Sequence, residues 1–402
     1  MKTELITENI QPAAEIIRRG GLVAVPTETV YGLAGNGLDE AAVKLIYEVK
    51  GRPEVKALSL MVPDSGAMER YCEDVPKAAY ALTKKFWPGP LTIILKSKPL
   101  VPEITRAGGK TVGLRCPDHP MTLALLRACG LPLAAPSANP SGSPSPKTAG
   151  EVAAYFDGAI DGIMDGGPCG IGTESTIIDL SAAPYRILRR GALSEEEVFS
   201  ALEESVTLIG ITGGTGGGKT TALRVLERKG ALILDCDVIY HELTVSSEDM
   251  RRELIERFGD VYDGTALNRK KLGGIVFADP AALSELNVIT HKYVSAALNA
   301  RIREFALNGG TLAAIDAIEL LSIPQSKRTL VNVAITAPLE ARVQRLMLRE
   351  GISEDYARKR IAAQKSDDYF AANCDAVLHN DGTKEDFEQK CFDYFTEVLK
   401  NV

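Results

Sequence analysis

The 402-residue sequence lacks several features that mark specialised classes of protein. It has no apolar run of about 18 residues, the length that a membrane-spanning helix needs. Its first 20 residues also lack the uninterrupted apolar stretch of a signal sequence. The seven cysteines include no CxxC pair and are too widely spaced for a disulfide framework or a zinc cage. We therefore expect a cytoplasmic enzyme with free thiols and no membrane partner.

Neither half of the chain carries an excess of positive charge. Lysine and arginine number 46 against 53 aspartates and glutamates, and both halves are slightly acidic. Binding driven by neutralising the phosphates of a long nucleic acid is therefore not the first expectation, although a local basic groove stays open. A small anionic substrate fits the composition equally well.

The length predicts two domains of about 200 residues each, because one hydrophobic core rarely organises a longer chain. In the first half, β-rich runs such as 91–96 and 111–116 alternate with helical patterns such as 41–50, which predicts an α/β domain with a twisted sheet. An acidic helical segment closes this half, and an apolar strand follows at 206–212 without a linker. We therefore predict domains at 1–205 and 206–402. Alternating strands and helices in the second predict right-handed βαβ units and a parallel sheet.

The stretch GITGGTGGGKTT at 210–221 fits the P-loop pattern GxxxxGK[ST], with an apolar strand before it and an amphipathic helix after it. This context argues against the alternative, a flexible linker between the two halves. Glycines let successive backbone amides converge on phosphate oxygens. Lys219 would span the β- and γ-phosphates, and the Thr220 hydroxyl would reach Mg²⁺. We therefore predict that ATP and Mg²⁺ bind here, with a loop made of Gly213, Gly214, Thr215, Gly216, Gly217, Gly218, Lys219 and Thr220.

Two acidic residues follow the next predicted strand, in LILDCDVIYH at 232–241. We expect Asp235 and Asp237 to lie on the same side of the pleat near the loop. Asp237 is the candidate base that orients or deprotonates an attacking hydroxyl, and Asp235 is its support. The alternative is that strand-end aspartates cap the following helix, and the two roles can be divided between the pair.

Three arginines, Arg342, Arg345 and Arg349, recur at spacings of three and four and hence on one helix face. Such a stripe is usually solvated. In a P-loop kinase, a basic helix leading into a mobile segment can instead close over the phosphates and stabilise the transferring charge. Both interpretations stay open at this point.

Taken in order, the second half resembles dephospho-CoA kinase. Besides the P-loop, the resemblance rests on DCDVIYHEL, the segment beginning RFGDVYDGTALNRKKLGGIVF, VAITAPLEARVQRLMLREGISEDYARKRIAAQ and CDAVLHNDGT. It implies transfer of the ATP γ-phosphate to the ribose 3'-hydroxyl of dephospho-CoA. Asp237, Arg269 and Asp316 would then lie on the dephospho-CoA side, and Arg345 and Arg349 on the ATP side. The chain departs from the family pattern in DAIELL at 316–321 and at Lys292, and another small-molecule P-loop kinase is the alternative.

The first half contains four unusually polar stretches, PTETVYGL, KGRP, APSANPSG and GTESTIID. Each is compatible with an ordinary turn or cap. Together they offer two cations, Lys50 and Arg52, with hydroxyl and amide donors that can meet an anion. No Ser-His-Asp or Cys-His series accompanies them. We therefore expect catalysis by binding, orientation and charge stabilisation, which suits adenylyl transfer without a covalent intermediate.

These stretches, with FWPGPLTIIL, VGLRCPDHP and ILRRGAL, resemble the YrdC-like threonylcarbamoyl-AMP synthase family over residues 5–195. The resemblance implies conversion of L-threonine, bicarbonate and ATP into threonylcarbamoyl-AMP and pyrophosphate, for later modification of adenosine 37 in tRNA. Lys50 and Arg52 are the candidate catalytic pair. The residues implied on the threonine or carbamate side are Thr29, Lys50, Arg115 and Ser175. The residues implied on the ATP side are Arg52, Lys56, Thr111, Ser137, Asn139, Ser145 and Arg189.

This half also departs from its family, with Lys56, Ala57 and Met61 where many members carry asparagine, proline and histidine. The alternative is an RNA-binding module without synthase activity. We predict a bifunctional fusion with a separate ATP site in each half, and with tRNA or tRNA-modifying proteins as further partners.

Overall fold

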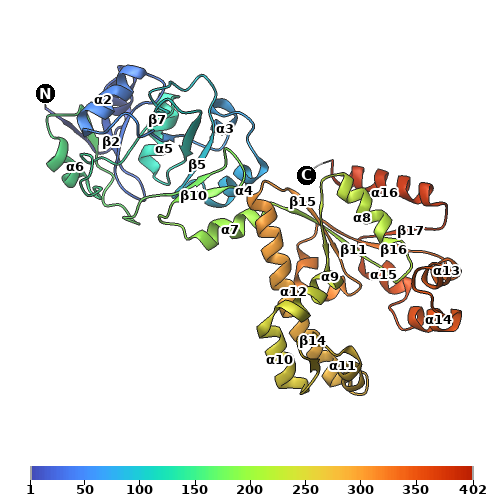
Figure 1. The fold of residues 1–402 in the computed structure, drawn as a ribbon. Coiled ribbons are helices and arrows are strands. Elements are labelled where there is room, and N and C mark those ends of the chain that lie inside the picture. Colours follow the sequence, from blue (N-terminus) through green and yellow to red (C-terminus); the bar gives the residue numbers. More distant parts are fainter. Residues whose placement is uncertain (1, 401–402) are drawn as a thin grey trace. The chain divides into compact units, whose positions relative to one another are not determined.

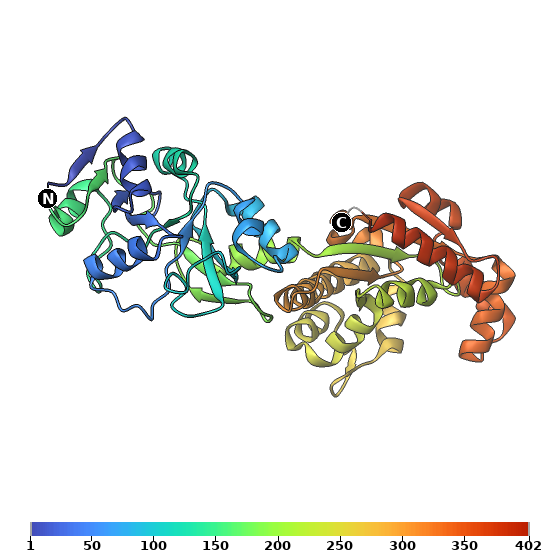
Figure 2. The same ribbon diagram turned by 90° about the horizontal axis from the view of Figure 1, so that it is seen from above.

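The computed structural model describes residues 2–400, and its backbone contacts divide the chain into two compact units. The first unit comprises the described residues up to Ser205 together with Leu307–Gly309, and the second comprises the remainder. The two units can be followed by colour, from blue to green and from green to red (Figure 1, Figure 2). Within residues 2–400, no helix combines the length and the apolarity that crossing a membrane requires. All seven cysteines are free thiols.

The first unit is built on a mixed ten-stranded sheet with the order β1-β8-β2-β3-β7-β4-β6-β5-β9-β10. For example, β5 pairs antiparallel with β6 and parallel with β9. The strands are β1 (Glu4–Ile6), β2 (Val23–Val25), β3 (Gly32–Asn36), β4 (Leu60–Met61), β5 (Leu91–Lys96), β6 (Thr111–Arg115), β7 (Leu133–Ala134), β8 (Gly162–Met164), β9 (Thr176–Asp179) and β10 (Arg186–Arg189).

Seven helices accompany this sheet in the described part of the unit, and local signals define their ends. Asp39 caps α2 by accepting from the amides of Ala41 and Ala42, and Gly51 ends it in the left-handed conformation. Ser194 and Glu197 form a capping box that starts α7. The helices are α1 (Gln11–Arg18), α2 (Glu40–Lys50), α3 (Ala67–Tyr71), α4 (Lys77–Phe86), α5 (Pro120–Cys129), α6 (Ala149–Phe156) and α7 (Glu195–Glu204).

The second unit contains a five-stranded, fully parallel sheet with the order β12-β15-β11-β16-β17. Its strands are β11 (Thr207–Thr212), β12 (Leu232–Asp235), β15 (Leu312–Asp316), β16 (Val331–Thr336) and β17 (Ala376–His379), and a short hairpin is formed by β13 (Tyr262–Asp263) and β14 (Ala266–Leu267). Because all five strands run the same way, their carboxyl ends meet at one edge, where a doubly wound sheet binds its ligand. The P-loop follows β11 at this edge.

Helices pack around this parallel sheet. Figure 1 shows α8 and α16 side by side against it, and their apolar side chains form one core with β11 and β16. Helices α10 and α11 with the β13–β14 hairpin form a lobe with its own apolar cluster. The helices are α8 (Lys219–Arg228), α9 (Cys236–Ser246), α10 (Glu248–Phe258), α11 (Arg269–Val276), α12 (Pro280–Leu307), α13 (Leu339–Glu350), α14 (Glu354–Ala362), α15 (Asp367–Asn373) and α16 (Lys384–Val398), with 3-10 turns η1 (Leu320–Ser322) and η2 (Pro324–Lys327).

Candidate active sites

A polar cavity lies over the P-loop at the carboxyl edge of the parallel sheet. It brings together most of the residues that the sequence places at the ATP site. Its lining consists of Gly214, Thr215, Gly216, Gly217, Gly218, Lys219, Thr220, Asp235, Asp237, Asp316, Ile318, Arg345, Arg349 and Arg360. Gly213 lies beside this lining, where its carbonyl accepts from Lys219 Nζ at 3.0 Å. Arg360 on α14 was not singled out in the sequence.

Side chains at the glycines of this loop would collide with residues packed behind it, on the side away from the cavity. A Cβ on Gly217 would lie 2.6 Å from the Ile335 carbonyl oxygen, and one on Gly214 would lie 2.9 Å from Arg342 Cζ. Gly216 and Gly218 have φ values of +80° and +110°, which disfavour any side chain. The close approach of β16 and α13 behind the loop therefore leaves no room for side chains at Gly214 and Gly217.

Asp235 and Asp237 are not on one face of a strand, which corrects the sequence prediction. Strand β12 ends at Asp235, and Asp237 lies in the first turn of α9. The Asp235 carboxylate accepts from the amides of Asp237 and Val238 at 2.9 and 3.0 Å and so caps the helix. Asp237 is not the capping residue of the helix, and its exposed side chain lines the cavity. The capping alternative thus describes Asp235, and Asp237 keeps a carboxylate free for an acceptor.

Asp316 ends β15 next to these two carboxylates. Burial is the largest cause of its raised pKa, which the Lys219 ammonium opposes and the neighbouring Asp235 and Asp237 support, and the net pKa is about 6. Its Oδ1 is buried and has no hydrogen-bond partner among the described residues. Such an orphaned oxygen in a phosphate-binding cavity is suited to a ligand that brings a donor or a cation.

Two arginines of the α13 stripe, Arg342 and Arg345, are turned toward the P-loop, whereas the third, Arg349, is exposed. Arg342 is 6% exposed and lies behind the P-loop, where Nε donates to the Thr215 carbonyl at 3.0 Å. Arg345 donates to the Gly216 carbonyl at 3.0 Å and reaches Asn380 Oδ1 at 3.3 Å. Arg349 lines the cavity and is paired with Glu350 at 2.6 Å. Two of the three arginines therefore hold the loop in shape.

A second cavity in the same unit shares Asp237 and Ile318 with the first. Its other lining residues come from α9, α12 and the segment after β15, namely Cys236, Tyr240, Leu286, Asn287, Thr290, His291, Val294, Ala317, Glu319 and Ile323. Asp237 therefore lies between the cavity over the P-loop and an adjoining, more apolar one. Arg269 at the start of α11 lines neither, but its charge acts on Tyr240, whose pKa is raised by burial and lowered by Arg269.

The first unit has its own polar cavity. It collects residues that are far apart in the sequence, and five of the predicted site residues are among them: Arg52, Arg115, Ser137, Ser175 and Arg189. The remaining lining is Val30, Tyr31, Gly32, Ala57, Leu58, Ser59, Met61, Thr92, Ala135, Pro136, Glu174 and Ile177. Three guanidinium groups around one hollow make it a site for an anionic ligand.

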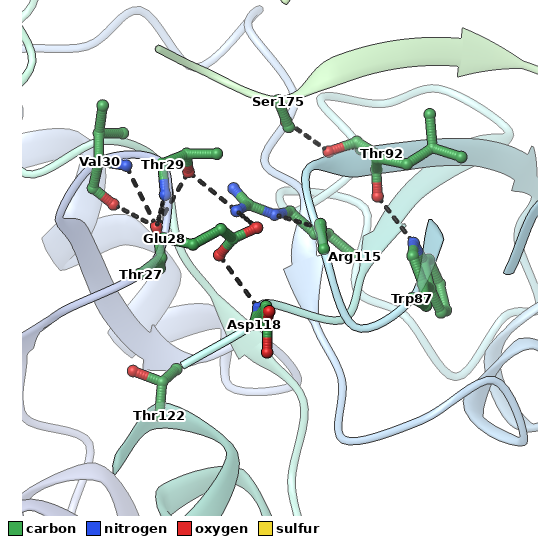
Figure 3. A network of polar contacts seen from close by, with 12 residues as sticks. Thr27, Glu28, Thr29, Val30, Trp87, Thr92, Arg115, Asp118, Thr122 and Ser175 are labelled. Carbon is green, nitrogen blue, oxygen red and sulfur yellow. Dashed lines mark hydrogen bonds and ion pairs between the residues drawn. The ribbon is translucent and has the colours of Figure 1, made fainter. Parts of the chain in front are cut away.

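Arg115 is held by a buried ion pair that the sequence did not predict. Its Nη2 donates to Glu28 Oε1 at 2.7 Å and to Thr29 Oγ1 at 2.8 Å, and both side chains of the ion pair are at most 13% exposed. Glu28 also accepts from the Asp118 amide at 3.0 Å. Figure 3 shows the guanidinium directed at Thr29 and Glu28. Thr29 therefore fixes Arg115 from a fully buried position.

A second missed carboxylate, Glu174, also lines the cavity. It pairs with Arg189 at 2.5 Å and accepts from Ser145 Oγ at 3.0 Å. Arg189 also donates to the Ser175 carbonyl at 2.8 Å, and the Ser175 hydroxyl lies 2.8 Å from that of Thr92 (Figure 3). Both missed carboxylates lie inside quoted motifs, PTETVYGL and GTESTIID, but their pairing with distant arginines is not visible in the sequence.

Four of the predicted residues, Lys50, Lys56, Thr111 and Asn139, do not line the cavity. Lys50 is 3% exposed and donates to the carbonyls of Ser137 and Asn139, and burial lowers its pKa to about 8. Instead of facing an anion, its ammonium ties down the loop that carries Ser137. The side chain of Lys56 is exposed, while its carbonyl accepts from Arg52 Nε at 3.2 Å. Thr111 begins β6, at the opposite end from Arg115, and does not line the cavity.

Comparisons with known proteins assign each unit to a family. The family model CoaE, described as dephospho-CoA kinase, matches residues 207–386. Over 188 residues the chain is 34% identical to the dephospho-CoA kinase of Geobacter sulfurreducens, covering 46% of this chain and 95% of that protein. The chain belongs to the dephospho-CoA kinase family. The matched residues of the dephospho-CoA kinase unit include the P-loop and the lining of both cavities described above for this unit.

The first unit is a Sua5/YciO/YrdC domain. The family model Sua5_yciO_yrdC, described as telomere recombination, matches residues 15–191. Over 195 residues the chain is 49% identical to the threonylcarbamoyl-AMP synthase of Bacillus subtilis, covering 48% of this chain and 56% of that protein. The chain thus spans about half the length of the synthases that it matches. A similar solved structure is that of Pyrococcus abyssi Sua5 complexed with L-threonine, at 28% identity and a TM-score of 0.49, covering 79% of this chain and 92% of that one.

Proposed function

We propose that the chain is a bifunctional enzyme of two ATP-using domains, residues 1–205 and 206–402. The first would make threonylcarbamoyl-AMP from L-threonine, bicarbonate and ATP, and the second would phosphorylate the 3'-hydroxyl of dephospho-CoA. The observation that carries the proposal is the pair of separate polar cavities, one ringed by Arg52, Arg115 and Arg189 and one built on the P-loop. Each unit supplies its own anion-binding groups, so neither activity needs the other.

In the kinase unit, the position of Asp237 between the two cavities supports a role as general base. An acceptor hydroxyl placed in the adjoining cavity would meet the Asp237 carboxylate, which accepts its proton as oxygen attacks the γ-phosphorus. Lys219 would leave the Gly213 carbonyl and stabilise charge on the transferring phosphoryl group. Arg345, Arg349 and Arg360 line the same cavity and add positive charge there.

Oxygen ligands at the P-loop fit a magnesium ion that accompanies ATP. The Thr220 hydroxyl and the orphaned Asp316 Oδ1 belong to the same cavity, and oxygens are the ligands that Mg²⁺ prefers. Among residues 2–400, no group of three or more His, Cys, Asp or Glu side chains could hold a metal by itself. The phosphates would therefore complete the coordination, and the ion would neutralise their charge.

In the synthase unit, three arginines line one cavity. Arg115, set by Glu28 and Thr29, suits the carboxylate of threonine or of its carbamate. Arg52 and Arg189 suit the triphosphate of ATP. A carbamate oxygen would attack the α-phosphorus and release pyrophosphate, so the protein's task is alignment and charge stabilisation. The product would serve modification of adenosine 37 in tRNA in the cytoplasm, with tRNA or tRNA-modifying proteins as partners.

Two substitutions on the intact chain test this division. Lys219→Ala should abolish phosphorylation of dephospho-CoA and leave threonine-dependent pyrophosphate release unchanged, and Arg52→Ala should do the reverse. Loss of both activities from either substitution would contradict two independent sites. Tight RNA binding without pyrophosphate release would favour a binding module for the first unit, and phosphorylation of a different acceptor would favour another kinase for the second.

A further inference from the structure

Thr215, in the middle of the P-loop, has all three of its polar groups bound by side chains from one distant segment. Its amide donates to Gln364 Oε1 at 2.8 Å, and Gln364 Nε2 donates to the Thr215 hydroxyl at 2.7 Å. Its carbonyl accepts from Arg342 Nε. Thr215 is only 8% exposed, so these contacts leave it little freedom. The partners lie 127 and 149 residues away in the sequence.

The segment that makes these contacts is residues 339–366, here named the arginine segment. It contains α13 and α14, which pack on each other through Val343, Leu346, Ala357 and Ile361. This small apolar cluster makes the two helices a unit of their own. The segment also carries Arg345, Arg349 and Arg360 into the phosphate cavity. The position of these arginines therefore depends on how the segment is attached to the P-loop.

The attachment has two ends. Arg342 and Arg345 on α13 hold the carbonyls of Thr215 and Gly216. Gln364, which follows α14, holds the other end through the Thr215 amide and hydroxyl, and its Oε1 also lies 3.4 Å from Arg342 Nη2. Without Gln364, α14 and its Arg360 would be joined to the loop only through α13.

We propose that Gln364 is a positioning residue that latches the arginine segment to Thr215 and so sets Arg360 and the arginines of α13 against the phosphates. It acts through these residues and does not line the cavity itself. The proposal rests on the proposed kinase function, because its purpose is to align charge with a transferring phosphoryl group.

Four variants of the full chain test the latch. Gln364→Leu removes both carboxamide contacts at similar size, whereas Gln364→Glu keeps two acceptors for the Thr215 amide and hydroxyl. Thr215→Val removes only the hydroxyl, whereas Thr215→Ser keeps it. Gln389→Leu is the matched control, since Gln389 donates to Asp393 on the exposed surface of α16.

We expect Gln364→Leu to lower kcat for dephospho-CoA phosphorylation about tenfold, with a smaller change in KM for ATP, and Thr215→Val to act in the same direction. Gln364→Glu and Thr215→Ser should restore most of kcat. Hydrogen exchange in the absence of nucleotide should rise at 354–362 and stay unchanged in β11 and α8. Gln389→Leu should match the wild type in both measurements.

Unchanged kcat and unchanged exchange at 354–362 in Gln364→Leu would overturn the latch. The same holds if Gln364→Glu is as impaired as Gln364→Leu while exchange rises throughout the unit, because that pattern means a general loss of stability. The exchange measurement needs no acceptor. If the wild type does not phosphorylate dephospho-CoA, the kinase proposal fails, while exchange at 354–362 still decides whether Gln364 holds the segment.

Discussion

Replacing Gly214 by alanine tests whether the rear of the P-loop is as tightly packed as the structure shows. The added Cβ would lie 2.9 Å from Arg342 Cζ and 3.1 Å from Gln364 Oε1. Arg342 cannot swing aside cheaply, because its guanidinium is bound to the Thr215 carbonyl and lies 3.6 Å from the Asp367 carboxylate. Overpacking of this kind costs about 1–3 kcal/mol.

If that strain is relieved by displacing the loop, kcat/KM for the kinase reaction should fall by about 10- to 100-fold, since each 1.4 kcal/mol is a factor of ten. The assay is ADP release with dephospho-CoA, together with a thermal melt. Threonine-dependent pyrophosphate release by the same sample is the internal control and should not change. Gly214→Ala with wild-type kcat/KM and melting temperature would refute the packing argument.

The matched control is Gly274→Ala in α11, where a Cβ would meet no atom within 4 Å. Alanine is the better helix former, so this substitution should stabilise the protein by about 0.5–1 kcal/mol and leave kinase activity intact.

The remaining predictions concern two carboxylates and a hydroxyl pair. Burial raises the pKa of Asp316 from its ordinary value of 3.8 to about 6 in the folded chain, so its ionisation opposes folding at high pH. The loss of folding free energy caused by this ionisation is complete above about pH 6 and disappears below about pH 4. Asp316→Asn, without nucleotide or divalent cations, should therefore raise stability by about 2–3 kcal/mol at pH 8 and not at pH 4; an equal gain at both would contradict the assignment. Glu28→Gln leaves Arg115 without its counter-charge and should destabilise the first unit by about 3–5 kcal/mol in a denaturant melt. An unchanged midpoint would show that the pair is not buried in solution. Thr92→Val removes one of two partners of the Ser175 hydroxyl, the other being Arg189, and should raise KM for threonine about 2- to 10-fold. Steady-state kinetics measures this change against Thr83→Val, whose hydroxyl donates to the Tyr80 carbonyl.

Local patterns were enough to predict most of the kinase unit's architecture. The strand, glycine loop and helix at 207–228 follow one another in the chain, and the spacing of Gly213, Gly218, Lys219 and Thr220 is itself the signal. The parallel sheet also follows from the alternation of strands and helices. The sequence left open which of Asp235 and Asp237 caps the helix, because this depends on where β12 ends, and strand boundaries are weakly encoded.

The sequence by itself determined that two families are joined in this chain and that one half carries a P-loop between a strand and a helix. Only the tertiary structure decided which charges face a ligand and which serve the fold. Lys50 looked like an anion-binding cation and is buried on the carbonyls of Ser137 and Asn139, while Arg115 is paired with a carboxylate 87 residues away. A hydrogen bond between residues so distant leaves no periodic trace in the sequence. A buried charge must nevertheless find a partner when the chain folds, and the packing of the elements selects it.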